Sequence, residues 1–252
     1  ILRAPLRPGM GTRAVPDDFI TEGRPMKAML LHQTASLKDN PSPLTYAEVP
    51  MPIPGRGEIL IAVSTCGVCH TELDEIEGRT PPARLPMVLG HQIVGRVAAL
   101  GENVTKWKIG DRIGIGWIHS ACGTCSFCLN GLENLCSEFK ATGRDAAGGY
   151  AEYTNIPEDS AYRIPEFFSD AEAAPLLCAG AIGYRSLRLT HLENGQNLGL
   201  TGFGASAHLV LKMTRFLYPG SRVFVFARSP TEQAFARELG ADIFDVEGSG
   251  PG

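Results

Sequence analysis

The sequence predicts a two-domain α/β protein, in which a barrel-like β domain is followed by a parallel sheet with helices. From Met26 to about Glu158, short apolar runs rich in β-branched residues are broken by Gly and Pro, a pattern typical of an antiparallel β domain. Further along, strand-like and helix-like segments alternate, which predicts βαβ units and a parallel sheet. We expect the first domain to cover residues 26–182 and the second to cover residues 183–252.

The first domain contains three clear strand candidates and two helix candidates. Each strand candidate is an apolar run bounded by turn-forming residues. The three predicted strands are 58–63, 92–98 and 111–115. A helix is expected to begin after Ser169 or Asp170, because either side chain can cap its first turn and Glu172 follows within that turn. Another helix is expected over 179–189.

The second domain is predicted from three strands that alternate with two helices. The strands are short apolar runs, and each helix candidate follows a strand. The predicted strands are 198–201, 223–227 and 241–246, and the predicted helices are 208–217 and 231–239.

Both ends of the chain differ from the predicted domains. Residues 1–25 carry Arg and Pro with little periodicity, start without Met and lack the long apolar core of a signal peptide. We expect this leader to be disordered or translated from upstream sequence. The chain stops at Gly252, soon after the last predicted strand, and we expect it to be a truncated form of a longer protein.

Composition and charge exclude several classes of function. The 252 residues are 44% hydrophobic and carry a formal net charge of −4, so the chain can bury one or two cores but offers no broad attraction to nucleic acid or to an anionic membrane. No apolar run approaches the ~20 residues that span a bilayer. Seven cysteines cannot all pair as disulfides, and they suit a reducing compartment in which thiolates bind metal. The predicted location is therefore cytoplasmic.

Four cysteines form a compact motif: Cys122, Cys125, Cys128 and Cys136. Thiolates at this spacing can wrap one tetrahedral metal ion if the intervening loop is tight. An all-sulfur tetrahedron suits zinc, with an iron–sulfur cluster as the chemical competitor. Four sulfur ligands leave no open coordination position, so the predicted role is structural. The alternative is that these are unrelated buried cysteines.

A second, scattered set consists of Cys69, His91 and Cys178. Taken singly, each has an ordinary explanation, because a lone histidine is usually a hydrogen-bonded structural residue and a cysteine on an apolar helix usually packs in a core. Cys66 and Cys69 could also form a redox or zinc-knuckle pair. A mixed site drawn from distant segments, however, would leave a fourth position for an exchangeable ligand, as catalytic zinc sites do.

The scattered set occurs among several further motifs in a defined order. They are Cys-Gly-Val-Cys-His-Thr-Glu at 66–72, Leu-Gly-His at 89–91, Gly-Asp-Arg-Ile-Gly at 110–114, the four-cysteine motif, Gly-Gly-Tyr-Ala-Glu-Tyr at 148–153 and Pro-Leu-Leu-Cys-Ala-Gly at 175–180. With these motifs the chain resembles the zinc-dependent medium-chain alcohol dehydrogenases from Met26 to Val246. The resemblance implies a GroES-like β-barrel catalytic domain, followed by part of a Rossmann-type doubly wound parallel sheet.

The resemblance also implies roles for individual residues. Cys69, His91 and Cys178 match the catalytic zinc ligands, with water or substrate in the fourth position, where zinc acts as a Lewis acid and lowers the pKa of an alcohol. Thr71 matches the hydroxyl that contacts the substrate oxygen and begins the proton relay, since a hydroxyl both donates and accepts; a helix N-terminal cap is the alternative. His70 matches a position that often approaches the cofactor pyrophosphate.

Two acidic residues are expected to hold the ligand geometry, and two positions depart from the family pattern. Glu72 and Asp111 are the expected supports of the zinc ligands. Gln92 stands beside the ligand histidine where the family often has Glu. Asp74 stands where the relay commonly ends in a histidine, and its lower reference pKa of about 3.9 makes it a weaker base near neutrality. We therefore expect activity with an altered pH profile.

Trp117 lies five residues before the four-cysteine motif, where some small-alcohol members of the family place a bulky aromatic side chain in the substrate pocket. By that resemblance the pocket favours short primary alcohols and aldehydes. The alternative is an ordinary buried tryptophan on a strand.

A dinucleotide signature follows the first strand of the second domain. Gly202 permits a tight turn, Gly204 allows close approach to a pyrophosphate, and Ala207 replaces the third glycine in a tolerated variant. At the end of the next strand the chain has Arg228 and Ser229 instead of an acidic residue. A cation and a hydroxyl there favour NADP(H) over NAD(H), unless the arginine simply points to solvent.

These observations lead to one preferred function and two alternatives. The preferred function is reversible hydride transfer between a small primary alcohol or aldehyde and a nicotinamide cofactor, with two zinc ions per chain. The first alternative is a catalytically silent zinc- and nucleotide-binding fragment, and the second is a redox sensor built on Cys66 and Cys69. The resemblance implies a homodimer or homotetramer for the complete enzyme, with no nucleic-acid or membrane partner.

Overall fold

The computed structural model describes residues 2–3 and 24–243 and divides the chain into two compact units. Unit 1 ends at Leu177 and unit 2 begins at Cys178, five residues before the boundary expected from the sequence. Most of the predicted leader lies outside the described residues. Each unit is considered by itself.

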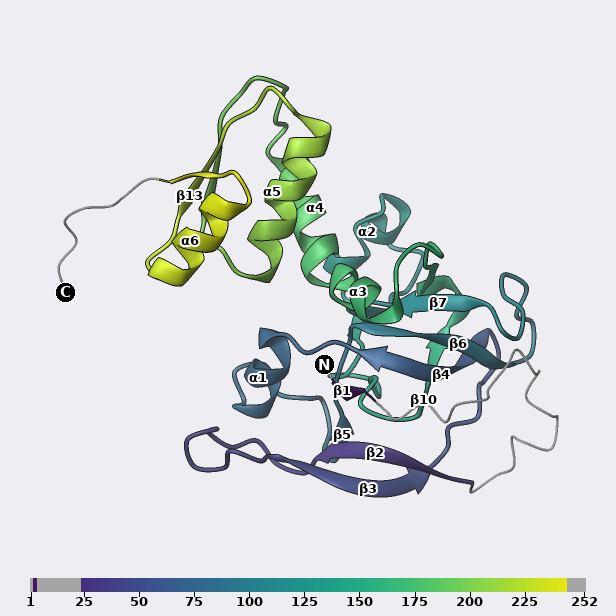
Figure 1. The fold of residues 1–252 in the computed structure, drawn as a ribbon. Coiled ribbons are helices and arrows are strands. Elements are labelled where there is room, and N and C mark those ends of the chain that lie inside the picture. The colour runs from purple at the N-terminus through teal and green to yellow at the C-terminus, as the bar shows by residue number, and fades with distance from the viewer. Residues whose placement is uncertain (1, 4–23, 244–252) are drawn as a thin grey trace. The chain divides into compact units, whose positions relative to one another are not determined.

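Unit 1 is an antiparallel β domain, as the sequence predicted. Its largest sheet has the strand order β1-β4-β6-β7-β11, and β10 also pairs with β4 (Figure 1). The strands of this sheet are β1 (Leu2–Arg3), β4 (Glu58–Cys66), β6 (Ile93–Leu100), β7 (Arg112–Ile115), β10 (Tyr153–Pro157) and β11 (Ala161–Arg163). Two residues of the predicted leader, Leu2 and Arg3, pair with the end of β4, and the expectation for the leader as a whole stays a prediction.

Two smaller sheets complete the strands of unit 1. They contain β2 (Pro25–Leu31), β3 (Leu44–Pro50) and β5 (Met87–Val88) in the order β3-β2-β5, and the pair β8 (Ile118–Ser120) and β9 (Lys140–Ala141). The core between the sheets is built from aliphatic side chains that are fully buried, among them Leu31, Ile59, Ile61, Ile93, Ile113, Ile115 and Ile156. Burying each of these stabilises the fold by roughly 1.5–3 kcal/mol, which explains why the β-branched runs of the sequence mark the strands.

The helices of unit 1 are short and lie between strands. They are α1 (His70–Ile76), α2 (Ser126–Leu129) and α3 (Asp170–Ala173), with 3₁₀ turns at Glu133–Leu135, Glu158–Ser160 and Ala174–Leu177. Ser169 caps α3: its hydroxyl accepts from the Glu172 N–H at 3.3 Å, and the Glu172 carboxylate accepts from the Ser169 N–H at 2.9 Å. The capped helix predicted from these residues is confirmed.

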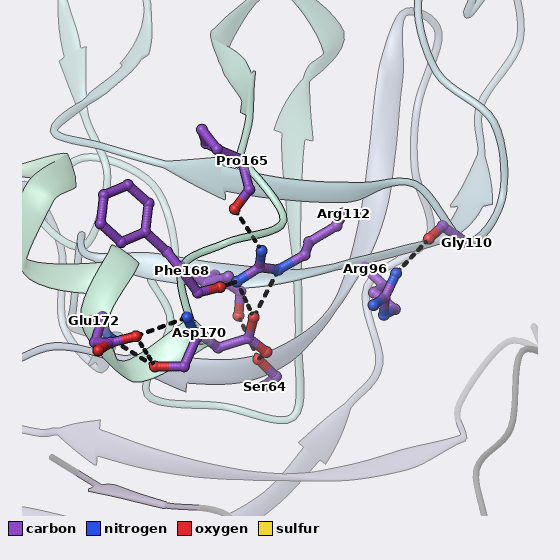
Figure 2. Close-up of polar contacts among 10 residues, drawn as sticks. Ser64, Arg96, Gly110, Arg112, Pro165, Phe168, Asp170 and Glu172 are labelled. Atoms are coloured by element: carbon purple, nitrogen blue, oxygen red, sulfur yellow. Dashed lines mark hydrogen bonds and ion pairs between the residues drawn. The ribbon is translucent and has the colours of Figure 1, made fainter.

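A buried arginine ties α3 to the large sheet (Figure 2). Arg112 on β7 donates from Nε to the Asp170 carboxylate at 2.8 Å and from its Nη atoms to the carbonyls of Pro165 and Phe168. The Ser64 hydroxyl on β4 donates to the other oxygen of Asp170. Because the guanidinium is surrounded by acceptors, its burial leaves none of its three nitrogens without a partner.

Unit 2 is a parallel sheet with the strand order β12-β13-β14. Its elements are α4 (Ala179–Leu189), β12 (Leu198–Thr201), α5 (Ala205–Leu217), β13 (Val223–Phe226), α6 (Pro230–Glu238) and β14 (Asp242–Ile243) (Figure 1). Leu211 of α5, Ala236 of α6 and two valines of β13, Val223 and Val225, are almost completely buried in its core.

The predicted βαβ pattern is therefore confirmed, with small differences at several element ends. Helix α5 begins three residues earlier than expected because Gly204 serves as its N-cap. The last three residues of the predicted strand 241–246 lie outside the described residues. Among the helices that the structure describes, none is both long and apolar enough to cross a membrane.

Candidate functional site

The structure brings together the four cysteines of the predicted motif, Cys122, Cys125, Cys128 and Cys136, and the segment 122–136 that carries them is called the lobe below. Their sulfur atoms all lie within 4.8 Å of one another, and the Sγ–Sγ separations are 3.9 Å for Cys122 and Cys128 and 3.6 Å for Cys125 and Cys128. A tetrahedral zinc ion with Zn–S bonds of about 2.3 Å separates its sulfur ligands by about 3.8 Å. The donor set therefore fits zinc in both chemistry and spacing.

Backbone amides already point at these sulfur atoms. The Cys125 N–H donates to Cys122 Sγ at 3.3 Å, and the Glu138 N–H donates to Cys136 Sγ at 3.3 Å. Donation from the backbone N–H groups of Thr124 and Cys125 lowers the pKa of the Cys122 thiol to about 6. Stabilising the thiolate in this way prepares the cluster for a cation, because the thiolate is the form that binds metal.

A second group of donor atoms is built around Cys69 and His91 within unit 1. Cys69 is the N-cap of α1, and His91 lies in the loop between β5 and β6. Cys69 Sγ lies 3.6 Å from His91 Nε2, and the His91 ring is 1% exposed. These two segments are distant in sequence, so only the packing of α1 beside the large sheet brings the two atoms together.

Glu72 connects both members of this pair. Its Oε2 accepts from the Cys69 N–H at 2.7 Å, and its Oε1 lies 2.7 Å from His91 Nδ1. A carboxylate on Nδ1 directs the lone pair of Nε2 toward the sulfur of Cys69, which is the arrangement that a metal-binding histidine requires. The contact expected from Glu72 is therefore present.

The electrostatics around His91 favour a cation. Burial alone would lower the pKa of the imidazole, but Cys69 and Glu72 together raise it to about 9. The ring is held between a thiol and a carboxylate, two groups that are anionic when ionised. A divalent cation bound at Nε2 and Sγ would satisfy the same field, so the residues present fit a zinc ion.

Glu75 is a site residue that the sequence reasoning missed. Its side chain is 0% exposed, and neither carboxylate oxygen has a hydrogen-bond partner in the part of the chain that the structure describes. Burial and the charge of Glu72 raise the pKa of Glu75 to about 8. The available signal was its position three residues after Glu72, because this spacing places two acids on one face if the segment is helical.

The remaining predicted residues of α1 lie toward its surface. Thr71 is the second residue of the helix, and its N–H donates to Cys69 Sγ at 3.3 Å. The cap is therefore Cys69, so the alternative role of Thr71 as the N-terminal cap was wrong. Asp74 accepts from Arg79 Nε at 2.5 Å, and its carboxylate lies 4.0 Å from the ring of His70, whose side chain is 80% exposed.

Asp111 does not lie with the ligand pair. Its carboxylate accepts from the Lys108 N–H at 3.1 Å and lies 3.5 Å from Arg163 Nη2. It lines a separate hollow of about 420 Å³ together with Arg96 and Arg112, two residues that are labelled in Figure 2. The contacts of Asp111 hold the turn before β7, so we correct the expectation that it supports the zinc ligands.

Gln92 and Cys66 form the packed wall behind the pair. Gln92 is 3% exposed, and a Cβ atom at Gly67 would lie 2.5 Å from its Oε1; glycine at 67 therefore makes room for the amide. Burial raises the pKa of the Cys66 thiol to about 12. A thiol that stays protonated is a poor nucleophile, and this weighs against the redox pair of Cys66 with Cys69.

Trp117 lies beside His91. Their ring centroids are 5.0 Å apart with an interplanar angle of 78°, an edge-to-face contact, and the Phe139 ring centroid lies 6.4 Å from the indole on another side. The tryptophan is only half-buried. Its position next to His91 is compatible with the predicted pocket residue, and that role stays a prediction.

In unit 2 the glycine turn forms a hollow of about 400 Å³ at the start of α5. Gly202 has φ of +78°, a left-handed conformation that favours glycine, and its N–H donates to the Phe226 carbonyl at 2.8 Å. Gly202, Gly204 and Ala207 all line the hollow. The first turn of a helix presents unpaired N–H groups to such a hollow, which suits a phosphate group.

Two predicted residues lie at the end of β13. Ser229 is the N-cap of α6 and Arg228 is exposed; neither is among the residues that line the hollow.

Cys178 is the first residue of unit 2 and the N-cap of α4. Its role as a third ligand stays a prediction.

Comparison with known proteins supports the same assignment. The family described as "Alcohol dehydrogenase GroES-like domain" matches residues 55–166. A Mycobacterium tuberculosis protein named "Probable alcohol dehydrogenase AdhA" is 44% identical over 204 residues, which are 79% of this chain and 58% of that protein.

Two solved structures show the same fold. A cinnamyl alcohol dehydrogenase from Sorghum bicolor superposes with a TM-score of 0.77 at 32% identity, covering 88% of this chain and 64% of that one. An acetophenone reductase from Geotrichum candidum in complex with NAD superposes with a TM-score of 0.76 at 26% identity, covering 88% and 65%.

The chain thus spans about three fifths of the length of these relatives (58–65%). The matched family covers the segment that carries β4, His91, Trp117 and the four-cysteine lobe. The chain is thus similar over most of its length to alcohol dehydrogenases with a GroES-like domain, and in this chain that domain is followed by part of a Rossmann-type sheet.

Proposed function

We propose that this chain is the zinc- and coenzyme-binding part of an alcohol dehydrogenase that transfers hydride reversibly between a small primary alcohol or aldehyde and a nicotinamide cofactor. One observation carries the proposal: Cys69 Sγ and His91 Nε2 lie 3.6 Å apart, and the Glu72 carboxylate contacts both residues. A buried Cys–His pair held by a carboxylate is the arrangement of a catalytic zinc site.

Cys69, His91 and Cys178 would hold the catalytic zinc, and the four lobe cysteines would hold a structural zinc. Support for Cys178 comes from its chain neighbour Leu177, whose carbonyl oxygen lies 2.9 Å from the position that a Cβ atom of Gly116 would take. Gly116 directly precedes Trp117, the residue that contacts His91. A peptide bond places the Cα atom of Cys178 about 3.8 Å from that of Leu177.

The chemistry divides between the metal and the chain. When bound, zinc withdraws electron density from the substrate oxygen and lowers the pKa of an alcohol. Glu72 fixes the tautomer and orientation of His91. The hydroxyl of Thr71, two residues after Cys69, would accept the substrate proton and pass its own onward. Asp74 would receive that proton near the surface, where its carboxylate also pairs with Arg79.

The coenzyme would bind in unit 2. Its pyrophosphate would lie against the turn of Gly202 and Gly204 at the start of α5, and Ala207 allows the helix to approach. Arg228 and Ser229 follow β13 at the position where the adenosine ribose is read, so we propose NADP(H) as the preferred coenzyme. His70, whose side chain is exposed, would contact the pyrophosphate from unit 1.

An alternative is a zinc- and nucleotide-binding chain without turnover. The observation that favours it is the coverage of 58% of the Mycobacterium tuberculosis relative. We also propose a cytoplasmic location, because seven cysteines cannot all pair as disulfides and suit a reducing compartment. From the family resemblance we propose assembly as a homodimer or homotetramer.

The first experiment is the zinc content per chain, measured by elemental analysis after gel filtration without added metal. The expected result is two zinc ions per chain, with oxidation of short primary alcohols that is faster with NADP⁺ than with NAD⁺. One zinc ion that disappears from a Cys128→Ser variant would mean that only the lobe binds metal, and the proposal would be wrong. Two zinc ions with coenzyme binding but no turnover would favour the alternative.

A further inference from the structure

Arg144 covers the tryptophan that lies beside the ligand histidine. Its guanidinium carbon Cζ is 5.5 Å from the centroid of the Trp117 ring, within the range of a cation–π interaction. The indole therefore has three defined neighbours: the His91 ring edge-to-face at 5.0 Å, the Phe139 ring at 6.4 Å and the arginine. Arg144 has no role in the function proposed above.

The arginine is itself held in place. Asp145 accepts from Arg144 Nη2 at 2.8 Å and from Arg144 Nε at 3.2 Å, and the same carboxylate accepts from the Ala141 N–H at 2.7 Å. These hydrogen bonds from Arg144 and Ala141 lower the pKa of Asp145 although partial burial alone would raise it. A paired, charge-assisted fork restricts the guanidinium to one orientation.

The backbone of this loop is also fixed to its surroundings. The Thr142 N–H donates to the Trp117 carbonyl at 2.9 Å, and the Arg144 carbonyl accepts from the Ala83 N–H at 3.0 Å. The N–H that binds the Trp117 carbonyl and the guanidinium that lies over the Trp117 ring thus belong to one short segment, residues 141–146. We call this segment, residues 141–146, the clamp, because it contacts Trp117 through both its backbone and the Arg144 side chain.

We propose that Arg144, positioned by Asp145, is a specificity-determining residue that holds the Trp117 indole edge-on to His91 and so restricts the substrate to short, unbranched primary alcohols and aldehydes. This inference rests on the proposed function, since it assigns the pocket beside His91 to the substrate. The physical reason is that a half-buried indole has several rotamers, and the contact with Arg144 favours the one in which the ring lies against His91. Releasing the indole would admit bulkier substrates.

The test compares the binding of two neutral aldehyde analogues, butyramide and cyclohexanecarboxamide, to the zinc-loaded full chain by calorimetry. Arg144→Gln is expected to lower the preference for the short amide by about 3- to 30-fold, the factor that corresponds to loss of one cation–π contact. Arg144→Lys keeps the positive charge but loses the paired hydrogen bonds to Asp145. Its preference for the short amide should therefore lie between those of the unmodified chain and Arg144→Gln. In a Trp117→Leu background, Arg144→Gln should change the preference no further.

A matched control is available in the same unit. Arg163 lies over the Trp107 ring at 5.0 Å, and the Trp107 indole donates to the Glu158 carbonyl. Arg163→Gln removes the same kind of contact without touching His91 or Trp117, so it should leave the ratio of the two affinities unchanged.

A second measurement follows the indole directly. With Trp107 replaced by Phe, acrylamide quenching reports Trp117 alone, because the chain has two tryptophans, and Arg144→Gln should increase the quenching. If that variant does not fold, Asp145→Asn should produce the same change to a smaller extent.

Unchanged quenching in the folded variant would overturn the clamp. An effect of Arg144→Gln that persists in the Trp117→Leu background would show that the arginine contacts the ligand itself, and would also overturn it. Increased quenching without a change in amide preference would overturn the specificity role. Absence of turnover in the unmodified chain counts against the proposed function alone, since neither measurement needs turnover.

Discussion

The two thiol sites of unit 1 are built in opposite ways. The four lobe cysteines lie within residues 122–136 and, except for Cys136, are only half-buried. The Cys69–His91 pair joins a helix start to a loop before β6, and its histidine is 1% exposed with two buried acids nearby, Glu72 and Glu75. A local, sulfur-only cluster needs little beyond its own loop, whereas a pair that joins a half-buried cysteine to a buried histidine depends on the whole sheet.

This difference predicts which substitutions destabilise each site. The lobe is stabilised by backbone amides that point at sulfur, and those amides move with the cysteines. The buried pair is surrounded by side-chain charges whose balance changes with each substitution, because a buried charge that loses its partner remains uncompensated.

The largest effect is expected from removing the imidazole of the buried pair. His91→Asn should eliminate one zinc ion per chain and reduce turnover by about 10²–10⁴-fold, because metal stabilisation of transition-state charge contributes several kcal/mol. Elemental analysis and steady-state kinetics measure both quantities. The lobe zinc should remain, and a variant that lost both ions would show that the two sites are not independent.

A smaller effect is expected from Glu72, which contacts His91 without being a ligand. Glu72→Gln should weaken zinc binding by about 10- to 100-fold, as is typical of residues that orient a ligand. Competition with a chromogenic chelator measures this affinity. Glu77→Gln is the control, since Glu77 follows the same helix but pairs with Arg79 at the surface; an equal loss in both variants would contradict the assigned role.

Glu75 predicts a change in the pH dependence of stability. Its pKa is raised to about 8 in the folded chain by burial and by Glu72, so the folded state keeps a proton that the unfolded state loses from about pH 4.5 upward. The folded state therefore loses stability relative to the unfolded state as the pH rises from about 4.5 to 8. Glu75→Gln, which cannot ionise, should melt above the unmodified chain at pH 8.

Glu77 provides a comparison, because its pKa is shifted in the opposite direction and its effect on the pH dependence of stability has the opposite sign. Arg79 and the Leu37 N–H lower the pKa of Glu77, so its stabilising contribution is present above pH 4.5 and is lost as the pH falls through the lowered value. Thermal melts from pH 4 to 9 on the metal-free chain measure both variants. Parallel curves for Glu75→Gln and the unmodified chain would show that Glu75 is not protonated at neutral pH.

The smallest effect on the buried pair is expected from the lobe. Cys128→Ser removes the sulfur that lies 3.6 Å from Cys125 and 3.9 Å from Cys122, so one zinc ion should be lost and residues 122–136 should become protease-sensitive. The large sheet should keep its circular dichroism spectrum and the zinc at Cys69 and His91. Loss of both metal ions would mean that the lobe stabilises the buried site after all.

Much of the fold and part of the site could be read directly from the sequence. Two elements have the bounds that were expected, the helix Ala179–Leu189 and the strand Leu198–Thr201, and Ser169 is the expected cap of α3. Each rests on local physics: hydrophobic periodicity, turn residues and a side chain that bonds the next helical turn. The four-cysteine cluster belongs to the same class, because its ligands are neighbours along the chain.

Only the tertiary structure decided the rest. Spacing along the chain did not reveal that Glu75 is buried with no hydrogen-bond partner among the described residues. It also did not reveal that Asp111 faces Arg163 instead of Cys69 and His91, or that Arg144 covers Trp117. Each of these depends on which segments pack together across the sheet. Burial and charge balance are properties of that packing, so local sequence determines which groups are available and the folded core determines what they do.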